Sequence, residues 1–296
     1  MLEFKKLELS DIDRIRHYFK HSVNRTCDNS VGGAFMWRDY FSVAYAEYNE
    51  TIIFKTKIVY SDNIIAFTLP LGKDVPGSIG KVVEYCQSTG MKVSFCTVTS
   101  DEIDFLETIF NDYEVFKEID WSDYVYRAED LKTLSGRRYN GQRNHMNFFK
   151  REFSDYSFEV ITSDNIGFVK DFYTKLSLNL ELSTKLSVEE HCKTFEVLDN
   201  FEAYGLYGGL LKVSGNVCAF AVGESINNVL FVHIEKADTA YRGAYQVINN
   251  ELVKHFATSE IEFINREEDV GDEGLRYSKR AYHPSEMIDK FIFLAL

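Results

Sequence analysis

Polar side chains end one of the most apolar stretches of the sequence. The run Val229–Ile234 is apolar on both faces, which is typical of a central strand. Because side chains alternate along a strand, we expect His233 and Glu235 on one face and Lys236 on the other. A carboxylate or imidazole there could deprotonate an attacking amine, and the Lys236 ammonium could stabilise a tetrahedral oxyanion. The predicted catalytic residues are Glu235, Lys236 and His233, with Glu235 ranked above His233; the alternative is a core histidine beside an exposed strand end.

A second polar group, Asn265–Asp269, follows a short apolar stretch. Side chains at the end of a buried strand emerge at the sheet edge, here next to a predicted helix over about 272–280. Acidic groups at this edge could hold an α-ammonium or a cationic acceptor, and arginines bind carboxylate or phosphate through two parallel hydrogen bonds. The alternative is a salt-bridged turn with a helix cap. The predicted substrate-binding residues are Asn265, Arg266, Glu267, Asp269, Arg276 and Lys279.

One segment, Arg137–Arg151, is basic although the chain as a whole is acidic. At helical spacing Arg143, Asn147 and Lys150 form a polar stripe, so the helix can dock on a core and present cations outward. A phosphate of tRNA, CoA or a lipid would suit this stripe, and the alternative is a linker helix whose cations pair with the acidic surface. The predicted anion-binding residues are Arg137, Arg138, Arg143, Lys150, Arg242 and Gly243.

The known signatures of cofactor and metal sites are absent from the sequence. Acyl-CoA pyrophosphate usually binds the backbone N–H groups of a glycine-rich loop at a helix start. The two segments at the corresponding places, 74–79 and 240–245, lack that pattern, which favours a different acyl donor. There is no P-loop, dinucleotide-binding, nucleophile-elbow or zinc-protease motif, so we expect no tightly bound cofactor and no metal.

Composition excludes several classes of protein. The 296 residues exceed one ordinary domain, and the content of 45% hydrophobic residues supports a folded protein. A net charge of −13 disfavours nonspecific binding to DNA or anionic membranes. The sequence shows no signal peptide and no apolar run of membrane-spanning length, and its 5 cysteines are scattered. These features predict a cytoplasmic protein without an integral membrane segment; the oligomeric state stays open.

The order of predicted elements occurs twice. In the first half, two helices precede strands at 43–48, 51–60 and 64–69, then a helix (about 77–88), a strand (92–98), a helix (about 101–110) and a strand region (about 113–126). In the second half, helices at about 164–177 and 187–202 precede strands at 206–213, 217–223 and 229–236. A helix (about 241–256), a strand (261–264), a helix (about 272–280) and a strand (287–294) complete it. We therefore predict an α+β protein with mixed, mainly antiparallel sheets and two domains, 1–130 and 131–296, with a basic bridging helix at about 137–153.

This order resembles the GNAT (acyl-CoA N-acyltransferase-like) fold repeated in tandem. The text from Ile264 through Arg276, with Lys279, Tyr282 and Pro284, and the segment Gly136–Phe149 are similar to uncharacterised proteins grouped with the C-terminal domain of phosphatidylglycerol lysyltransferases. Phe35-x-Trp37 followed by Tyr40 fits more loosely. That family shares its tandem fold with the Fem-type aminoacyltransferases. The resemblance covers nearly the whole chain and implies acyl or aminoacyl transfer.

Three functional hypotheses remain open. The first is an aminoacyltransferase that passes an activated ester, such as aminoacyl-tRNA, to an amine or hydroxyl of a lipid head group, a peptide or a small molecule. The second is an acyl-CoA-dependent N-acyltransferase, and the third is a non-catalytic binding or regulatory module. We place the active cleft in the second unit because its polar strand ends have no counterpart at Thr68–Leu71 in the first.

Overall fold

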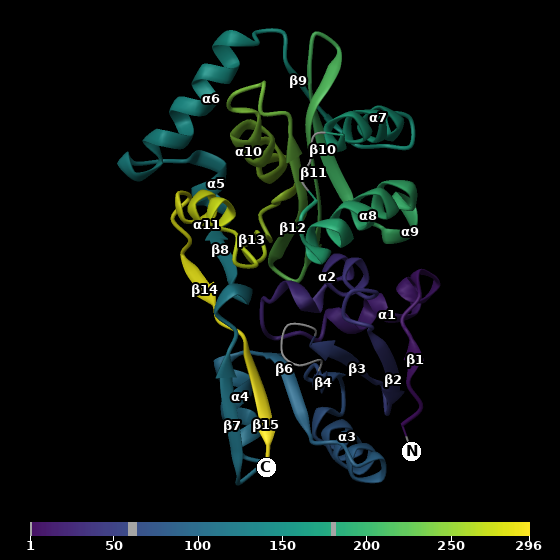
Figure 1. The fold of residues 1–296 in the computed structure, drawn as a ribbon. Helices are drawn as coiled ribbons and strands as arrows, with labels where there is room; N and C mark the ends of the chain where they lie inside the picture. Colours follow the sequence, from purple (N-terminus) through teal and green to yellow (C-terminus); the bar gives the residue numbers. More distant parts are fainter. Residues whose placement is uncertain (1, 59–63, 179–181) are drawn as a thin grey trace. The chain divides into compact units, whose positions relative to one another are not determined.

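The computed structural model describes residues 2–58, 64–178 and 182–296. The chain forms two compact units. The first comprises Met1–Asp123, Glu268–Gly271 and Ile288–Leu296, and the second comprises Tyr124–Glu267 and Asp272–Met287. The two units are described separately below (Figure 1).

The first unit is built on one sheet in the order β1-β2-β3-β4-β6-β15-β7, with β5 paired to β3. Its strands are β1 (Lys5–Lys6), β2 (Ala44–Tyr48), β3 (Thr51–Ile58), β4 (Ile64–Phe67), β5 (Leu71–Gly72), β6 (Ser94–Val98), β7 (Tyr113–Lys117) and β15 (Phe291–Ala295). Its helices are α1 (Ile12–Phe19), α2 (Val31–Met36), α3 (Val75–Thr89) and α4 (Ser100–Glu107). Apolar residues of α3 and α4 pack on one face of this sheet and form its core.

Local sequence explains where α3 begins and ends. The Asp74 side chain caps its first turn by accepting a hydrogen bond from Gly77 N at 3.0 Å. The helix ends at Gly90, whose φ of 69° lies in the left-handed region that glycine adopts freely. Between these residues Ile79, Val82 and Cys86 are buried against the sheet. The helix is therefore placed by its cap and by one apolar face.

The second unit has a sheet in the order β14-β8-β13-β12-β11-β10-β9. Its strands are β8 (Asp123–Arg127), β9 (Ser157–Val160), β10 (Tyr207–Val213), β11 (Asn216–Ile226), β12 (Val229–Ala237), β13 (Phe263–Asn265) and β14 (Glu286–Ile288). Its helices are α5 (Ala128–Thr133), α6 (Asn140–Glu152), α7 (Ile166–Ser177), α8 (Lys185–Asp199), α9 (Phe201–Tyr204), α10 (Ala244–Phe256) and α11 (Glu273–Arg280). Among the strand pairs with a described register, only β4–β6 and β12–β13 are parallel.

Helices cover both faces of the second sheet. Helix α10 packs its apolar side on alternate residues of β10, β11 and β12, which together form the main core of this unit. Helices α7 and α8 lie on the other side of these strands (Figure 1). There the Phe172 and Phe220 rings meet edge to face at 6.2 Å. Residues that alternate along β11 and β12 therefore face two different environments.

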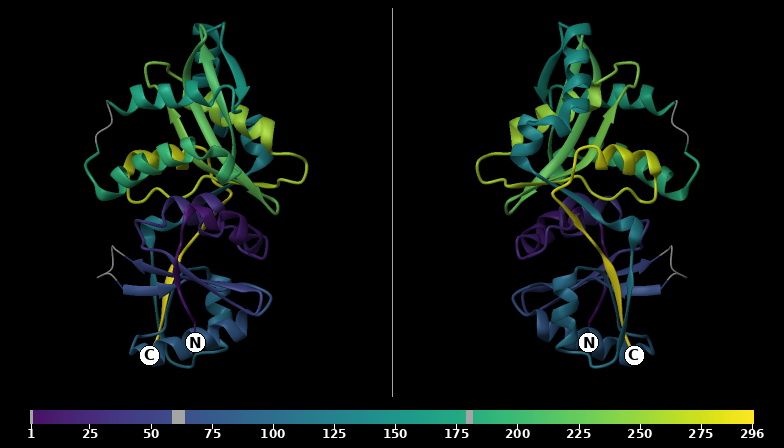
Figure 2. Two further views of the ribbon diagram at one scale, coloured as in Figure 1. Left: turned by 90° about the vertical axis from the view of Figure 1, so that its right-hand side faces the viewer. Right: turned by 90° about the vertical axis from the view of Figure 1, so that its left-hand side faces the viewer.

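The two sheets exchange strands: at two places, strands that follow one another in the sequence belong to different sheets. The predicted strand region at about 113–126 is two strands: β7 pairs with β15 in the first sheet, and β8 pairs with β13 in the second. The predicted strand at 287–294 divides in the same way, because β14 pairs with β8 whereas β15 runs between β6 and β7. Figure 2 shows the yellow β15 among the blue strands of the first sheet. The prediction of a single strand at 287–294 was therefore wrong, and the predicted strand region at about 113–126 comprises two strands.

The exchange also affects the domain boundary. The compact units are not separated by a single cut, because two short segments from the end of the sequence belong to the first unit. The prediction of one boundary after residue 130 was based on the repeat in the sequence. That repeat does not indicate that segments near the end of the sequence belong to the first unit.

The remaining elements agree with the predicted order. The α+β class, the mainly antiparallel sheets and the tandem GNAT-like arrangement are confirmed. The second of the two helices predicted before the first strands lies at 31–36, where the Ser30 side chain caps it by accepting from Gly33 N. Helix α5 was not predicted. Residues 59 and 60, the predicted end of the second strand, lie outside the described residues.

Candidate functional site

The predicted strand ends meet where β12 and β13 separate. The parallel register of these two strands covers Val229 to Phe231 on β12 and Phe263 to Asn265 on β13. Strand β12 continues to Ala237, whereas β13 ends at Asn265. Glu235 therefore lies on β12 beyond the paired region, and Arg266 follows β13 directly.

Glu235 and Arg266 form a buried ion pair. The guanidinium Nη2 donates to Glu235 Oε1 at 3.1 Å, and Asn249 Nδ2 of α10 donates to Oε2 at 2.9 Å. The guanidinium also lies over the Tyr282 ring, 4.7 Å from its centroid, and 5.9 Å from the Tyr126 centroid. Both carboxylate oxygens of Glu235 are thus engaged, and the guanidinium is fixed in one orientation.

Two polar atoms of this cluster lack partners. Arg266 is only 9% exposed, yet its Nη1 has no hydrogen-bond partner among the described residues, and neither has Oδ1 of the buried Asn249. Burial opposes the charge of Arg266, but Glu235 raises its pKa above the usual value, so the side chain stays cationic. A buried donor left unpaired costs about 1–3 kcal/mol, which a bound oxyanion would offset. The cluster is therefore suited to hold an anionic or polarised oxygen.

His233 does not share a face with Glu235. The register of β11 and β12 shifts where Val222 pairs with Ile234 and Gly223 pairs with Val232, so His233 is the extra residue of a bulge. The bulge reverses the alternation of side chains beyond it. Glu235 consequently faces α10, and the prediction that both residues point to one side was wrong.

The His233 imidazole is held between two carboxylates. Its Nε2 lies 2.9 Å from Glu224 Oε1 and its Nδ1 lies 2.7 Å from Glu267 Oε1. Burial alone would lower its pKa, but the hydrogen bonds to both glutamates raise it to about 10. The ring is therefore protonated at neutral pH, and neither nitrogen is available to accept a proton.

This triad makes stability depend on alkaline pH. A histidine whose folded pKa is about 10, against an ordinary 6.5, stabilises the fold fully below pH 6.5 and loses that contribution as pH rises toward 10. We expect the free energy of unfolding, measured in urea, to fall more steeply from pH 7 to 9.5 in the wild type than in His233→Gln. The exposed His255→Gln is the matched control and should keep the wild-type slope. Equal slopes in all three proteins would contradict the protonated triad.

The Lys236 side chain contacts neither the Arg266 cluster nor the His233 triad through any described contact. Its ammonium pairs with Glu190 of α8, on the face opposite α10. Burial lowers its pKa, but Glu190 outweighs that effect and raises it. Lys236 is thus a paired cation away from Glu235, as the predicted alternation implied, and it does not reach the Arg266 cluster through any described contact.

The other predicted substrate-binding residues separate into different roles. Asn265 Oδ1 accepts from Glu267 N at 2.6 Å, which shapes the turn that brings Glu267 to His233. Asp269 Oδ1 accepts from Gly271 N at 3.0 Å in a segment of the first unit. On α11, Lys279 Nζ lies 5.8 Å from the Tyr124 ring centroid. Among the predicted substrate-binding residues, which also include Arg276, the described contacts link only Arg266 to Glu235.

Most of the predicted anion-binding cations are used internally. Arg143 donates to Leu134 O, Gly136 O and Asn140 Oδ1, Arg138 Nη2 pairs with Asp130 at 2.9 Å, and Lys150 pairs with Glu251 of α10 at 3.6 Å. These contacts are drawn from the described residues. They fall within the second unit, so we place α6 on α10 in that unit rather than as a bridge. For Arg138 and Lys150 this pairing favours the alternative interpretation, in which the cations of the helix pair with acidic residues. Arg137 is exposed on a short 3₁₀ turn.

Arg242, a predicted anion-binding residue, and Arg151, which was not predicted, border one surface hollow. Arg151 and Arg242 lie 5.6 Å and 4.8 Å from the centroid of the Phe148 ring. They line an open pocket of about 570 Å³ together with Gly141, Asn144, His145 and Asn147. The spacing Phe148 to Arg151 on α6 was visible in the sequence, but the approach of Arg242 depends on tertiary packing.

Gly243 is required by packing. Its φ is 96°, and a Cβ at this position would lie 2.4 Å from the backbone oxygen of His145. Helix α6 therefore occupies the space beside the start of α10. In the first unit, the Asp74 carboxylate caps the start of α3. We assign Gly243 a packing role.

The first unit contains a buried charge cluster that sequence reasoning missed. Lys290 is 1% exposed, and its Nζ lies 2.6 Å from Asp28 Oδ2, 2.8 Å from Asp123 Oδ1 and within bonding distance of Glu268. Burial raises the pKa of Asp123 to about 7 and also that of Asp28, whereas the nearby Lys290 lowers the pKa of Glu268 against the effect of burial. These residues are far apart in the sequence, so no local pattern could reveal them.

Comparison with known proteins now gives the family. Residues 19–294 match the family model described as phosphatidylglycerol lysyltransferase, C-terminal. A conserved protein of unknown function from Bacteroides thetaiotaomicron is 31% identical, with both chains covered completely and a TM-score of 0.89. Among the described residues, no helix combines the length and the apolarity that a membrane crossing requires.

Two more distant structures share the fold. The C-terminal domain of a putative lysylphosphatidylglycerol synthetase from Agrobacterium fabrum has a TM-score of 0.66 at 12% identity, covering 97% of this chain and 92% of its own. FemX has a TM-score of 0.60 at 7% identity, covering 98% and 96%. Family and fold together indicate aminoacyl transfer as the class of reaction. The chain belongs to the family of the phosphatidylglycerol lysyltransferase C-terminal domain.

Proposed function

We propose that this protein transfers an aminoacyl group from an aminoacyl-tRNA to an amine or hydroxyl acceptor. The observation that carries the proposal is the buried Arg266 guanidinium, held by Glu235, with its Nη1 free of any described partner where β12 and β13 part. A fixed cationic donor in a site shielded from water stabilises a developing oxyanion more strongly than it would in water.

The chemistry needs little beyond positioning and charge stabilisation. The acceptor nitrogen or oxygen attacks the ester carbonyl carbon, and the carbonyl oxygen takes up the electron pair. When the tetrahedral intermediate collapses, the bond to the ribose oxygen breaks, and the acceptor's proton passes to that leaving oxygen or to solvent. In our assignment Arg266 Nη1 donates to the oxyanion, and Glu235 and Asn249 orient the guanidinium. The ester is already activated, so positioning supplies much of the rate.

Glu235 and His233 have supporting roles in this proposal. Glu235 accepts hydrogen bonds on both oxygens, which makes it a positioning residue for Arg266 rather than a free base. His233 is protonated between Glu224 and Glu267 and cannot remove a proton. Lys236, paired with Glu190, is left outside the reacting group.

The proposed donor is chosen from the surface sites that the second unit offers to a phosphate-bearing ligand. Helix α6 packs against Gly243 at the start of α10, and the loop there lacks the glycine-rich pattern of a pyrophosphate site. The hollow bordered by Arg151, Arg242 and Phe148 offers two cations and an aromatic ring, the combination that binds a nucleic acid backbone and stacks a base. This favours tRNA over acyl-CoA. The name of the family supports the same reaction class.

The test is a transfer assay with the purified protein. Total tRNA charged with radiolabelled amino acids is incubated with the protein and with separate lipid, peptide and small-amine acceptors, and label leaving the tRNA for an acceptor is measured. We expect transfer from charged tRNA and none from free amino acid. Transfer from acetyl-CoA or a longer acyl-CoA, with none from charged tRNA, would establish the N-acyltransferase instead. No transfer from either donor would favour the non-catalytic module.

The surface hollow provides a second readout. Each lost phosphate contact should reduce the slope of log affinity against log salt by about one. We therefore expect Arg151→Ala and Arg242→Ala each to weaken tRNA binding and flatten this slope. Arg138→Ala, which removes a cation already paired with Asp130, is the matched control and should change neither.

A further inference from the structure

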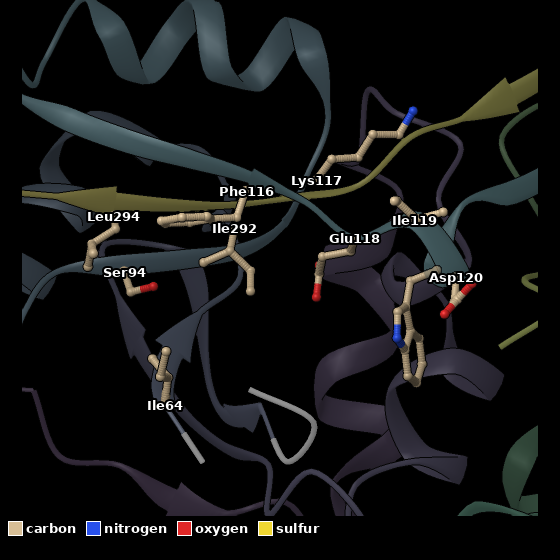
Figure 3. Close-up of a pocket in the computed structure, with 10 residues that line it drawn as sticks. Ile64, Ser94, Phe116, Lys117, Glu118, Ile119, Asp120, Ile292 and Leu294 are labelled. Atoms are coloured by element: carbon tan, nitrogen blue, oxygen red, sulfur yellow. The ribbon is translucent and has the colours of Figure 1, made fainter. Parts of the chain in front are cut away.

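The first sheet leaves part of one face open. Helices α3 and α4 pack on the face that includes Phe95 and Phe293. The residues that alternate with these, Ser94, Cys96 and Ile292, point to the opposite face. Over β6, β15 and β7 this opposite face borders a pocket of about 450 Å³, a volume within the usual range for small-molecule sites (Figure 3).

The walls of this outer pocket are mainly apolar, with a few polar groups directed into it. The apolar walls come from Ile64, Phe116, Ile119, Trp121, Ile292 and Leu294. Figure 3 shows the Ser94 hydroxyl and the Glu118 carboxylate turned toward the space between these walls. Ser94 is 1% exposed, and its Oγ has no hydrogen-bond partner among the described residues. Because an unpaired buried hydroxyl is energetically unfavourable, a ligand group that forms a hydrogen bond with Ser94 Oγ would be stabilising.

A smaller cavity of about 100 Å³ adjoins the outer pocket. Trp121 lines both, so the two share one wall. Aromatic side chains surround the inner cavity: Trp37, Phe41 and Phe54, with the Phe41 and Trp121 rings meeting edge to face at 5.6 Å. Aromatic faces of this kind attract cations through the ring quadrupole.

The inner cavity ends at the buried charge cluster. Asp28 and Glu268 line it, and both also contact Lys290. With Asp123, three carboxylates meet the single ammonium of Lys290. Burial raises the pKa of Asp28 and Asp123, so protons can offset part of this acidic excess, and a second cation at the cavity end would stabilise the ionised carboxylates instead. Cys27, Asp123 and Glu268 could together ligate a metal ion, but the Lys290 ammonium already lies among them.

We propose that this cavity binds a primary amine with an apolar stem. The ammonium lies against Asp28 and Glu268 between the aromatic walls, and the stem passes Trp121 into the outer pocket, where Ser94 meets a polar group at the far end. The first unit thereby recognises a cationic ligand, whereas a carboxylate or phosphate at the same place would meet the acidic cluster. The proposal does not depend on aminoacyl transfer.

The test compares ligands that differ only in the polar end. Binding of butylammonium, hexylammonium and octylammonium to the full chain is measured by titration calorimetry, with hexanoate and hexanol as matched controls. We expect hexylammonium to bind at least about tenfold more tightly than either control, because only the amine balances the acidic excess. Affinity should rise with chain length as the stem fills the outer pocket. Equal binding of amine and carboxylate would overturn the proposal.

Variants test the location. Asp28→Asn should weaken hexylammonium binding by about tenfold or more while leaving hexanol unchanged. Glu268→Gln is a second variant with the same expected result, and circular dichroism establishes that each is folded. Glu84→Gln, which neutralises an exposed acid of α3, is the control and should bind as the wild type does. Unchanged amine binding in folded Asp28→Asn and Glu268→Gln would rule out this cavity.

A final variant separates this inference from the proposed function. Arg266→Ala lies in the second unit and should leave amine binding unchanged even where transfer is lost. Loss of transfer with intact amine binding would count only against the transferase assignment. Absence of amine binding in a protein that transfers aminoacyl groups would count only against the cavity.

Discussion

Replacing Arg266 by alanine is expected to lower kcat/KM for aminoacyl transfer by about 10²–10³-fold, the usual cost of removing one oxyanion donor. The loss should appear mainly in kcat, because the guanidinium donates to an oxygen whose charge develops only in the transition state. KM for the charged tRNA should change little, since the tRNA contacts are assigned to Arg151 and Arg242. Steady-state kinetics with a saturating acceptor provide the measurement.

Two further variants distinguish chemistry from stability. Arg266→Ala leaves Glu235 buried without its cation, which by itself destabilises the fold. Arg266→Lys keeps a positive charge beside Glu235 but lacks the planar fork, so it should fold and still show a lowered kcat. Arg280→Ala removes an exposed cation of α11 and should have near-normal kinetics. A folded Arg266→Lys with wild-type kcat would refute the assigned role.

Replacing Lys290 by methionine is expected to lower the free energy of unfolding by about 3–5 kcal/mol at pH 7.5, as found when one partner of a buried ion pair is removed. The side chains are similar in length, so the loss reflects charge rather than volume. Asp28, Asp123 and Glu268 would then lack the ammonium that faces all of them. Urea unfolding measures the change.

The pH dependence of this variant has a definite sign. Without Lys290 the buried carboxyls take up protons more readily in the folded state than in the unfolded chain, so acid should restore stability. We expect the deficit of Lys290→Met to shrink as pH falls from 8 to 5. Lys117→Met removes the ammonium of an exposed ion pair with Asp289 and should cost less than about 1 kcal/mol. A Lys290→Met deficit that does not change with pH would contradict the cluster's role.

Much of the fold could be predicted because its signals are local. The alternation in 206–213 and 229–236 marks strands, and the acidic cap before α3 with Gly90 after it marks a helix. The partner of a strand is not local information. Nothing in 113–126 indicates that its two ends belong to different sheets, because both ends have the same strand-forming composition.

The candidate site shows the same division. Glu235 and Arg266 were both predicted at polar strand ends of the second unit, and the structure brings them to 3.1 Å. The face of His233 was predicted wrongly because one bulge residue reverses the alternation. The Lys290 cluster could not be predicted at all, since Asp28 and Lys290 meet only after the whole chain has folded.

The exchanged strands have a consequence for synthesis on the ribosome. Strand β7 joins the first sheet only through β15, which is translated after every other element described. Before β15 is translated, the edges of β6 and β7 that pair with it are exposed in the first unit. Asp28 and Asp123 also lack the ammonium of Lys290 at this stage. Unpaired edges of this kind attract other chains and promote aggregation. The first unit can therefore be completed only after the strands of the second unit have been translated.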